Sequence, residues 1–99
     1  MTEREKIVQF LQDNFNYMKV NYHILKIGLI GSLARGEQTE KSDIDLLVEF
    51  EPDTKDLYEL KIRLKQYIRS NLNRNVDICR EKYLKPYIKD LILKEAIYV

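Results

Sequence analysis

Three aspartates and a Gly-Ser pair are the residues of this sequence whose types and positions best fit a chemical role. Asp43 and Asp45 are separated by one residue, and ten residues lie between Ser32 and Asp43. Asp77 comes later, inside the short apolar stretch VDIC. Carboxylates bind metal ions, and the backbone N–H groups of a glycine turn bind phosphates. Together these residues predict a site for a metal ion and a phosphate group.

The two neighbouring aspartates belong to the stretch DIDLLVEF, which alternates as a strand does. Residues i and i+2 of a strand point to the same side, so the two carboxylates share one face, about 7 Å apart at their Cβ atoms. Two unit charges about 4 Å apart repel by about 4 kcal/mol at an effective dielectric constant of 20. Either a bound cation or protonation of some carboxylates relieves this repulsion, and oxygen ligands favour Mg²⁺ or Mn²⁺ over Zn²⁺. An isolated Asp-x-Asp is nevertheless common on solvated surfaces, and it is weak evidence by itself.

The Gly-Ser pair follows an apolar stretch and precedes Leu33-Ala34-Arg35, which favour a helix. Gly31 lets the backbone approach a ligand closely, and Ser32 adds a hydroxyl. An alternative is that Ser32 simply caps the helix. Arg35 can bind a phosphate or pair with Glu37 or Glu40, and we expect it to face the phosphate.

The elements that must position these residues can be predicted from the apolar pattern. A capping box and apolar spacing predict a first helix over 3–18. Strands are expected at 24–30, 43–50 and 76–79. A helix capped by Asp53 and running to about Leu72 should precede the third strand, and a last helix should begin near Pro86. The expected order is α-β-(turn)-β-α-β-α, which is an α/β (α+β) fold with a small sheet. If the two aspartate-bearing strands are adjacent in this sheet, the three carboxylates meet at one point.

Composition limits the class of protein. The chain has 99 residues, of which 44% are hydrophobic and 33% charged, and this predicts a single domain over 1–99. The net charge of +1 gives no strong signal for nucleic-acid binding. No apolar run approaches the roughly 20 residues of a membrane span, and the N-terminus lacks a secretory pattern. With Cys79 as the single cysteine, these features predict a cytoplasmic protein without disulfides.

The combined pattern, GSLARGEQTEKSDIDLLVEF followed by VDIC and a final helix, resembles the minimal nucleotidyltransferases of the polymerase-beta-like nucleotidyltransferase superfamily. The resemblance implies a mixed sheet flanked by helices, the nucleotidyltransferase fold. It also implies that Asp43 and Asp45 bind Mg²⁺, with two ions expected, and that Asp77 is the third metal-binding carboxylate. Gly31-Ser32 would cradle the β- and γ-phosphates of ATP, the expected substrate.

The resemblance further implies a partner. Minimal nucleotidyltransferases are typically paired with helical HEPN ribonucleases in toxin-antitoxin modules, so this chain is expected to be the antitoxin. It would transfer AMP from ATP to a tyrosine hydroxyl of the toxin, an AMPylation. Two alternatives are a catalytically weak module that neutralises the toxin by contact, and transfer to a small molecule. Tyr83, Tyr87 and Tyr98, with the last helix, are candidates for a partner surface or for contacts in a homo-oligomer.

Overall fold

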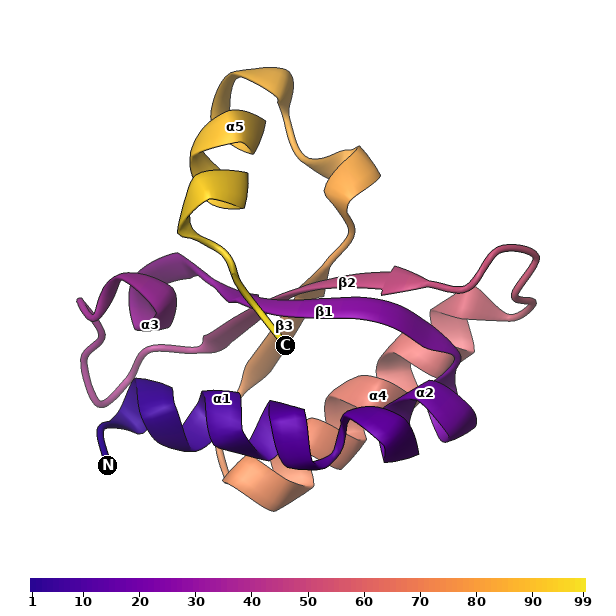
Figure 1. Cartoon of the computed structure of the whole chain (residues 1–99), viewed down its shortest axis with the longest axis horizontal. Helices are drawn as coiled ribbons and strands as arrows, with labels where there is room; N and C mark the ends of the chain where they lie inside the picture. Colours follow the sequence, from indigo (N-terminus) through magenta and orange to yellow (C-terminus); the bar gives the residue numbers. More distant parts are fainter.

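The computed structural model describes the whole chain, residues 1–99, as a four-stranded sheet flanked by helices (Figure 1). The strand order is β3-β2-β1-β4, in which β2 runs antiparallel to β1 and parallel to β3, and β4 runs antiparallel to β1. The strands are β1 (Ile24–Ile30), β2 (Ile44–Phe50), β3 (Val76–Cys79) and β4 (Ile97–Tyr98). The predicted α/β class with a mixed sheet is therefore confirmed, and three of the four strands were expected.

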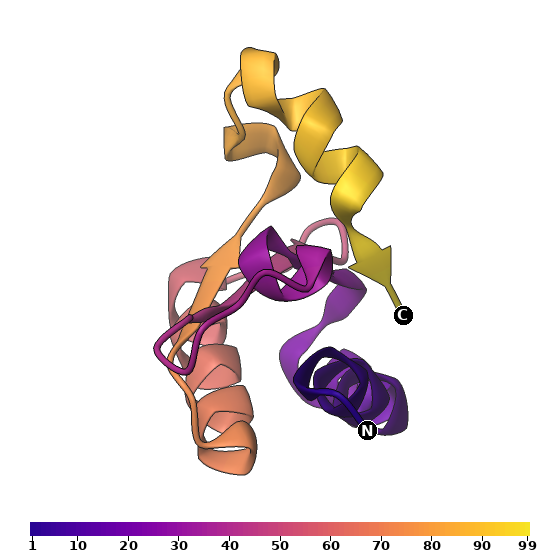
Figure 2. The same cartoon turned by 90° about the vertical axis from the view of Figure 1, so that its left-hand side faces the viewer.

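The helices lie on both sides of this sheet. Figures 1 and 2 show α1, α2 and α4 on one side, whereas the 3-10 turn η1 and α5 rise from the other and α3 follows the end of β1. Their bounds are α1 (Glu3–Asp13), α2 (Phe15–Tyr22), α3 (Gly31–Arg35), α4 (Leu57–Leu72), η1 (Glu81–Tyr83) and α5 (Pro86–Glu95). None of the helices has the length and apolar character needed to cross a membrane.

The hydrophobic core lies between the sheet and the layer formed by α1, α2 and α4. One face of β2 supplies the alternating residues Ile44, Leu46, Val48 and Phe50, all of which are buried as predicted. The helices contribute buried aliphatic side chains at helical spacing, among them Ile7, Leu11, Leu60, Leu64 and Ile68. Because this face of β2 is packed, the residues between these positions, including Asp45, point to the opposite face of the sheet.

The first helix differs from the prediction, because two helices replace the continuous one expected over 3–18. The break falls at Asn14, whose side chain donates to the carbonyl oxygen of Phe10 over 2.9 Å. Its Oδ1 also accepts a hydrogen bond from the Tyr67 hydroxyl at 3.0 Å. Asparagine competes in this way with the helical backbone pattern. After the break, α2 continues beyond the predicted end, to Tyr22.

The start of α4 also differs from the prediction. Asp53 does not cap this helix, which begins at Leu57 and ends at Leu72 as expected. The residue before the helix, Asp56, adopts a left-handed conformation (φ 57°) and makes no side-chain capping bond. Asp53 is itself left-handed (φ 63°), so both aspartates serve the turn that follows β2.

The C-terminal segment departs from the inward packing that its apolar spacing predicts for Ile88, Leu91, Ile92 and Ala96. The last helix begins at Pro86 as predicted, but none of its residues is buried, and Leu91 is 59% exposed. It stands away from the sheet in Figures 1 and 2 and contacts α3. Tyr83 and Tyr87 are 71% and 78% exposed on this segment. Strand β4 was not predicted, because two residues are too few to show a period.

Strand β4 pairs with the middle of β1 at the edge of the sheet. Tyr98 pairs with Gly28, and a Cβ atom built on Gly28 would lie 2.7 Å from the Tyr98 ring. The Lys26 ammonium lies 4.3 Å from the centroid of the same ring. The Tyr98 hydroxyl is buried without a hydrogen-bond partner. Glycine is thus required here by the close approach of an aromatic ring, which only the tertiary structure reveals.

We predict that Gly28→Ala lowers the free energy of unfolding by about 1–3 kcal/mol, the usual cost of overpacking. Tyr98→Val removes the ring, so the same alanine should cost much less in that background. Chemical denaturation of the four proteins of this double-mutant cycle measures the coupling. Additive effects would show that the ring of Tyr98 does not lie over Gly28 in solution.

Candidate active site

The three predicted aspartates lie on one face of the sheet, opposite the packed core. Because β2 and β3 are parallel neighbours, Asp45 and Asp77 are direct partners in the register, with adjacent strands about 4.8 Å apart. Asp43 precedes Asp45 by two residues, and β2 begins at the residue between them. Asp43 and Asp77 are exposed, whereas Asp45 is half-buried. Strands β2 and β3 are therefore adjacent, which is the condition for bringing the three carboxylates together.

The ionisation of Asp45 is affected by its burial and by its acidic neighbours. Burial raises the pKa of the Asp45 carboxyl above its usual value, and the charges of Asp77 and then Asp43 raise it further. Arg35 acts in the opposite direction. Asp77 and Asp43 thus oppose the ionisation of Asp45, and a bound cation would relieve this repulsion.

The Gly-Ser turn is in contact with this group of carboxylates. Ile30, the last residue of β1, pairs with Asp45, and Gly31 follows it with a φ of 76°. A Cβ atom on Gly31 would lie 2.5 Å from Oδ2 of Asp45. Glycine is therefore needed twice here, for the left-handed backbone and for the approach to the carboxylate.

The short helix α3 presents Ser32 at this position. Its N-cap residue is Ile30, and no side chain caps it, so Ser32 is not the helix cap considered as an alternative. Leu33 and Ala34 are buried and anchor the helix against the core. The turn is thus held in place by buried side chains, while Ser32 itself is partly accessible.

Arg35 already has acidic partners in this structure. Its Nε lies 2.8 Å from Glu37 and its Nη1 lies 3.1 Å from Glu95 at the end of α5. The sequence suggests Glu37 or Glu40 as a partner of Arg35 but gives no sign of Glu95, because Arg35 and Glu95 are 60 positions apart and no spacing rule links them. Arg35 remains close enough to the carboxylates to favour the ionised form of Asp45.

Cys79 is the other reactive residue type on this face. It pairs with Leu47 in the register of β2 and β3. Burial raises the pKa of its thiol, and the charges of Asp77 and Asp45 raise it further. The thiol is therefore held in its protonated, poorly nucleophilic form, as expected for a small packing residue and not for a nucleophile.

The aspartates offer a partial set of ligands for a metal ion. No group of three Asp, Glu, His or Cys side chains is arranged to hold a metal ion by itself, so the three aspartates share a face without forming a closed cage. Mg²⁺ commonly uses one or two carboxylates together with substrate phosphates and water. Asp43 and Asp45, next to the Gly31 turn, supply oxygen donors of this kind, and the repulsion at Asp45 gives a cation a favourable place.

Comparison with known proteins agrees with this geometry. The family model described as "Nucleotidyltransferase domain" matches residues 4–99. The chain therefore belongs to the nucleotidyltransferase domain family, and it is a nucleotidyltransferase.

Its relatives narrow the class. Protein adenylyltransferase MntA of Thermococcus cleftensis is 33% identical, with 100% of this chain and 98% of the relative covered. A Methanocaldococcus jannaschii protein, named provisionally as protein adenylyltransferase MJ1379, is 36% identical over the full length of both chains. A solved structure described provisionally as a minimal nucleotidyltransferase superposes with a TM-score of 0.79 at 31% identity, covering 97% of this chain and 95% of that one.

The fold is shared more widely. A crystal structure described as a toxin-antitoxin with AMP-PNP superposes with a TM-score of 0.64. It is 23% identical, and the match covers 98% of this chain and 72% of that one. The predicted fold of the minimal nucleotidyltransferases is thus confirmed.

Gly31→Ala should destabilise the protein more than Gly36→Ala. Both glycines are left-handed, so each alanine pays about 1–2 kcal/mol of backbone strain. Only at Gly31 does the new Cβ meet a carboxylate, whereas at Gly36 the nearest atom, on Arg4, is 3.6 Å away. Denaturant titration of both variants measures the difference, and equal losses would contradict the contact between Gly31 and Asp45.

Asp45→Asn should raise the stability of the metal-free protein at neutral pH. The carboxyl has its usual pKa of 3.8 in the unfolded chain and a raised pKa in the folded one. Between these values the native state binds more protons, so wild-type stability falls as the pH rises through this window. The variant lacks this loss, and its advantage should therefore grow from below pH 3.8 to neutral pH. Thermal melts with a chelator test this, and parallel stability curves would contradict it.

Proposed function

We propose that this protein is a Mg²⁺-dependent adenylyltransferase that transfers AMP from ATP to a hydroxyl group of a partner toxin and thereby acts as its antitoxin. The observation that carries the proposal is the contact of the Gly31 turn with Asp45, whose register partner is Asp77. A turn suited to phosphates and a set of carboxylates suited to a metal ion thus meet at one end of the sheet. Phosphoryl and nucleotidyl transfer need these two components side by side.

The relatives support the choice of substrate. The Thermococcus cleftensis protein is named a protein adenylyltransferase, and the match covers this whole chain. The fold neighbour with AMP-PNP is described as a toxin-antitoxin, which makes a toxin the natural acceptor to test. Within that class we propose a HEPN ribonuclease and a tyrosine hydroxyl as the acceptor.

Each residue of the site has a role in this reaction. Asp43 and Asp45 would hold Mg²⁺, which neutralises the phosphate charge and stabilises the attacking and leaving oxygens when it is bound. The backbone of Gly31-Ser32 would bind the β- and γ-phosphates, and the Ser32 hydroxyl would add a donor. Asp77 lies on the far side of Asp45 from this turn, since β2 separates β3 from β1. There it would orient the acceptor hydroxyl and accept its proton.

Arg35 would strengthen phosphate binding from the end of α3. Its guanidinium is shared between Glu37 and Glu95, and both pairs are partly exposed. Exposed ion pairs contribute little stability, so a triphosphate can compete for the same guanidinium at small cost.

Asp43→Asn and Asp45→Asn should each reduce AMP transfer by on the order of 10²-fold or more, because loss of one charge-stabilising group at a reaction centre has effects of this size. Incorporation of label from α-labelled ATP into a co-purified HEPN toxin measures the rate, with and without Mg²⁺. Asp53→Asn is the matched control, since Asp53 lies beyond the opposite end of β2 and asparagine tolerates its left-handed backbone.

Three results would contradict parts of the proposal. Undiminished labelling by both site variants would remove the two aspartates from the reaction. Neutralisation of the toxin without any labelling would favour a module that acts by contact. Labelling that persists when every tyrosine of the toxin is replaced by phenylalanine would exclude tyrosine as the acceptor.

A further inference from the structure

The loop between α3 and β2 carries Asp43 but has no helix or strand to fix it. It is largely exposed, and its own bonds form a turn at Thr39–Ser42. The Ser42 amide donates to the carbonyl oxygen of Thr39 at 3.1 Å, and the Thr39 amide donates to the Ser42 hydroxyl at 2.9 Å. These bonds close the turn on itself, but they do not attach it to the rest of the protein.

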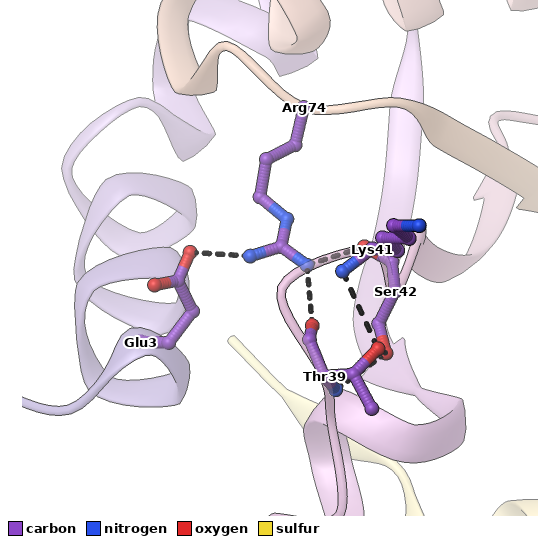
Figure 3. A network of polar contacts seen from close by, with 5 residues as sticks. All are labelled: Glu3, Thr39, Lys41, Ser42 and Arg74. Atoms are coloured by element: carbon purple, nitrogen blue, oxygen red, sulfur yellow. Dashed lines mark hydrogen bonds and ion pairs between the residues drawn. The ribbon is translucent and has the colours of Figure 1, made fainter.

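The attachment comes from Arg74, which lies between α4 and β3 (Figure 3). Its Nη2 donates to the carbonyl oxygens of Ser42 and, at 3.4 Å, of Thr39. Its Nη1 forms an ion pair with Glu3 at the start of α1, at 2.8 Å. The Arg74 side chain is only 16% exposed. One guanidinium therefore joins three segments that are distant in the sequence.

This attachment acts on the residue next to the reaction centre. Ser42 directly precedes Asp43, and on its other side the Ile44 amide donates to the carbonyl oxygen of Asn75 at 2.8 Å. Asp43 is thus held between two bonds that both run to the segment carrying Arg74 and Asn75. That segment continues directly into β3, which carries Asp77. The segment with Arg74 and Asn75 therefore links the position of Asp43 to that of Asp77.

Only arginine can make all of these bonds. Its planar guanidinium presents five donors in a fixed arrangement, and charged donors form the stronger hydrogen bonds. A lysine ammonium is a single point charge on a flexible chain, and it cannot bind two carbonyl oxygens and a carboxylate in the same geometry.

We propose that Arg74 is a positioning residue that fixes the loop before Asp43 and so holds this carboxylate at the distance from Asp45 and Asp77 that the reaction needs. The inference rests on the proposed adenylyltransferase function for its effect on rate. The structural part, that Arg74 orders the loop, can be measured independently of any reaction.

The variants are Arg74→Gln and Arg74→Lys, with Arg74→Ala for chemical rescue by added guanidinium ion at non-denaturing concentrations. Arg69→Gln is the matched control. Arg69 and Arg74 both line a pocket of about 390 Å³ beside Asp43, but the Arg69 side chain makes no hydrogen bond or ion pair. Glu3→Gln removes the ion pair to α1 while leaving the bonds from Arg74 to the loop in place.

Three readouts are needed: amide hydrogen exchange of Ser42 and Ile44, the affinity for Mn²⁺, and kcat and KM for AMP transfer. We expect Arg74→Gln to speed exchange at both amides, to weaken Mn²⁺ binding and to lower kcat by on the order of 10²-fold, the cost of a displacement of about 1 Å. The KM for ATP should change little, because the Gly31-Ser32 turn is untouched. Added guanidinium should restore part of the kcat of the Arg74→Ala variant. The Arg74→Lys variant should stay impaired.

Unchanged exchange at Ser42 and Ile44 in Arg74→Gln would overturn the inference, as would full activity of Arg74→Lys. A loss of kcat that guanidinium does not rescue and that is matched by a general loss of thermal stability would assign Arg74 a purely structural role. If the wild-type protein transfers no AMP at all, the proposed function fails. Amide hydrogen exchange and the affinity for Mn²⁺ then still decide whether Arg74 positions Asp43.

Discussion

The mutual repulsion of carboxylates on one face of the sheet is the constraint on which the rest of this structure depends. Asp45 lies half-buried opposite Asp77, and both neighbouring aspartates make its ionisation less favourable. Burial is the larger cause of this cost, and the charges of Asp77 and Asp43 add to it. The packed face of β2, in the core beneath these charges, is the main source of the compensating stability.

Such stored repulsion is useful to a nucleotidyltransferase. A site of preorganised negative charge favours the arrival of a cation, and the cation in turn favours the polyphosphate. The Gly31 turn, which we propose binds phosphate, lies against Asp45 without a side chain between them. The unfavourable electrostatics of the free protein and its expected affinity for a metal-nucleotide complex thus have one structural origin.

In the proposed reaction, the sheet order separates the phosphates from the acceptor. Strand β2 carries Asp45, β1 ends in the turn proposed to bind the phosphates, and β3 carries Asp77 on the other side. An in-line transfer places the attacking and leaving oxygens on opposite sides of the phosphorus. The acceptor hydroxyl is then expected on the β3 side. Helix α5, none of whose residues is buried, rises from the face of the sheet that carries the aspartates.

The sequence by itself determined the elements that have a clear period and the chemistry that they carry. Alternation in DIDLLVEF fixed β2 and put Asp43 and Asp45 on one face, and the apolar stretch around Asp77 fixed β3. Only the tertiary structure decided the contacts between residues far apart in the chain, such as Arg35 with Glu95 and Arg74 with the loop before β2. The strand β4, the break in the first helix and the exposure of α5 belong to the same group. Local spacing encodes which face a side chain occupies, whereas such partners are chosen by how the packed elements meet in space, and no short-range pattern records that choice.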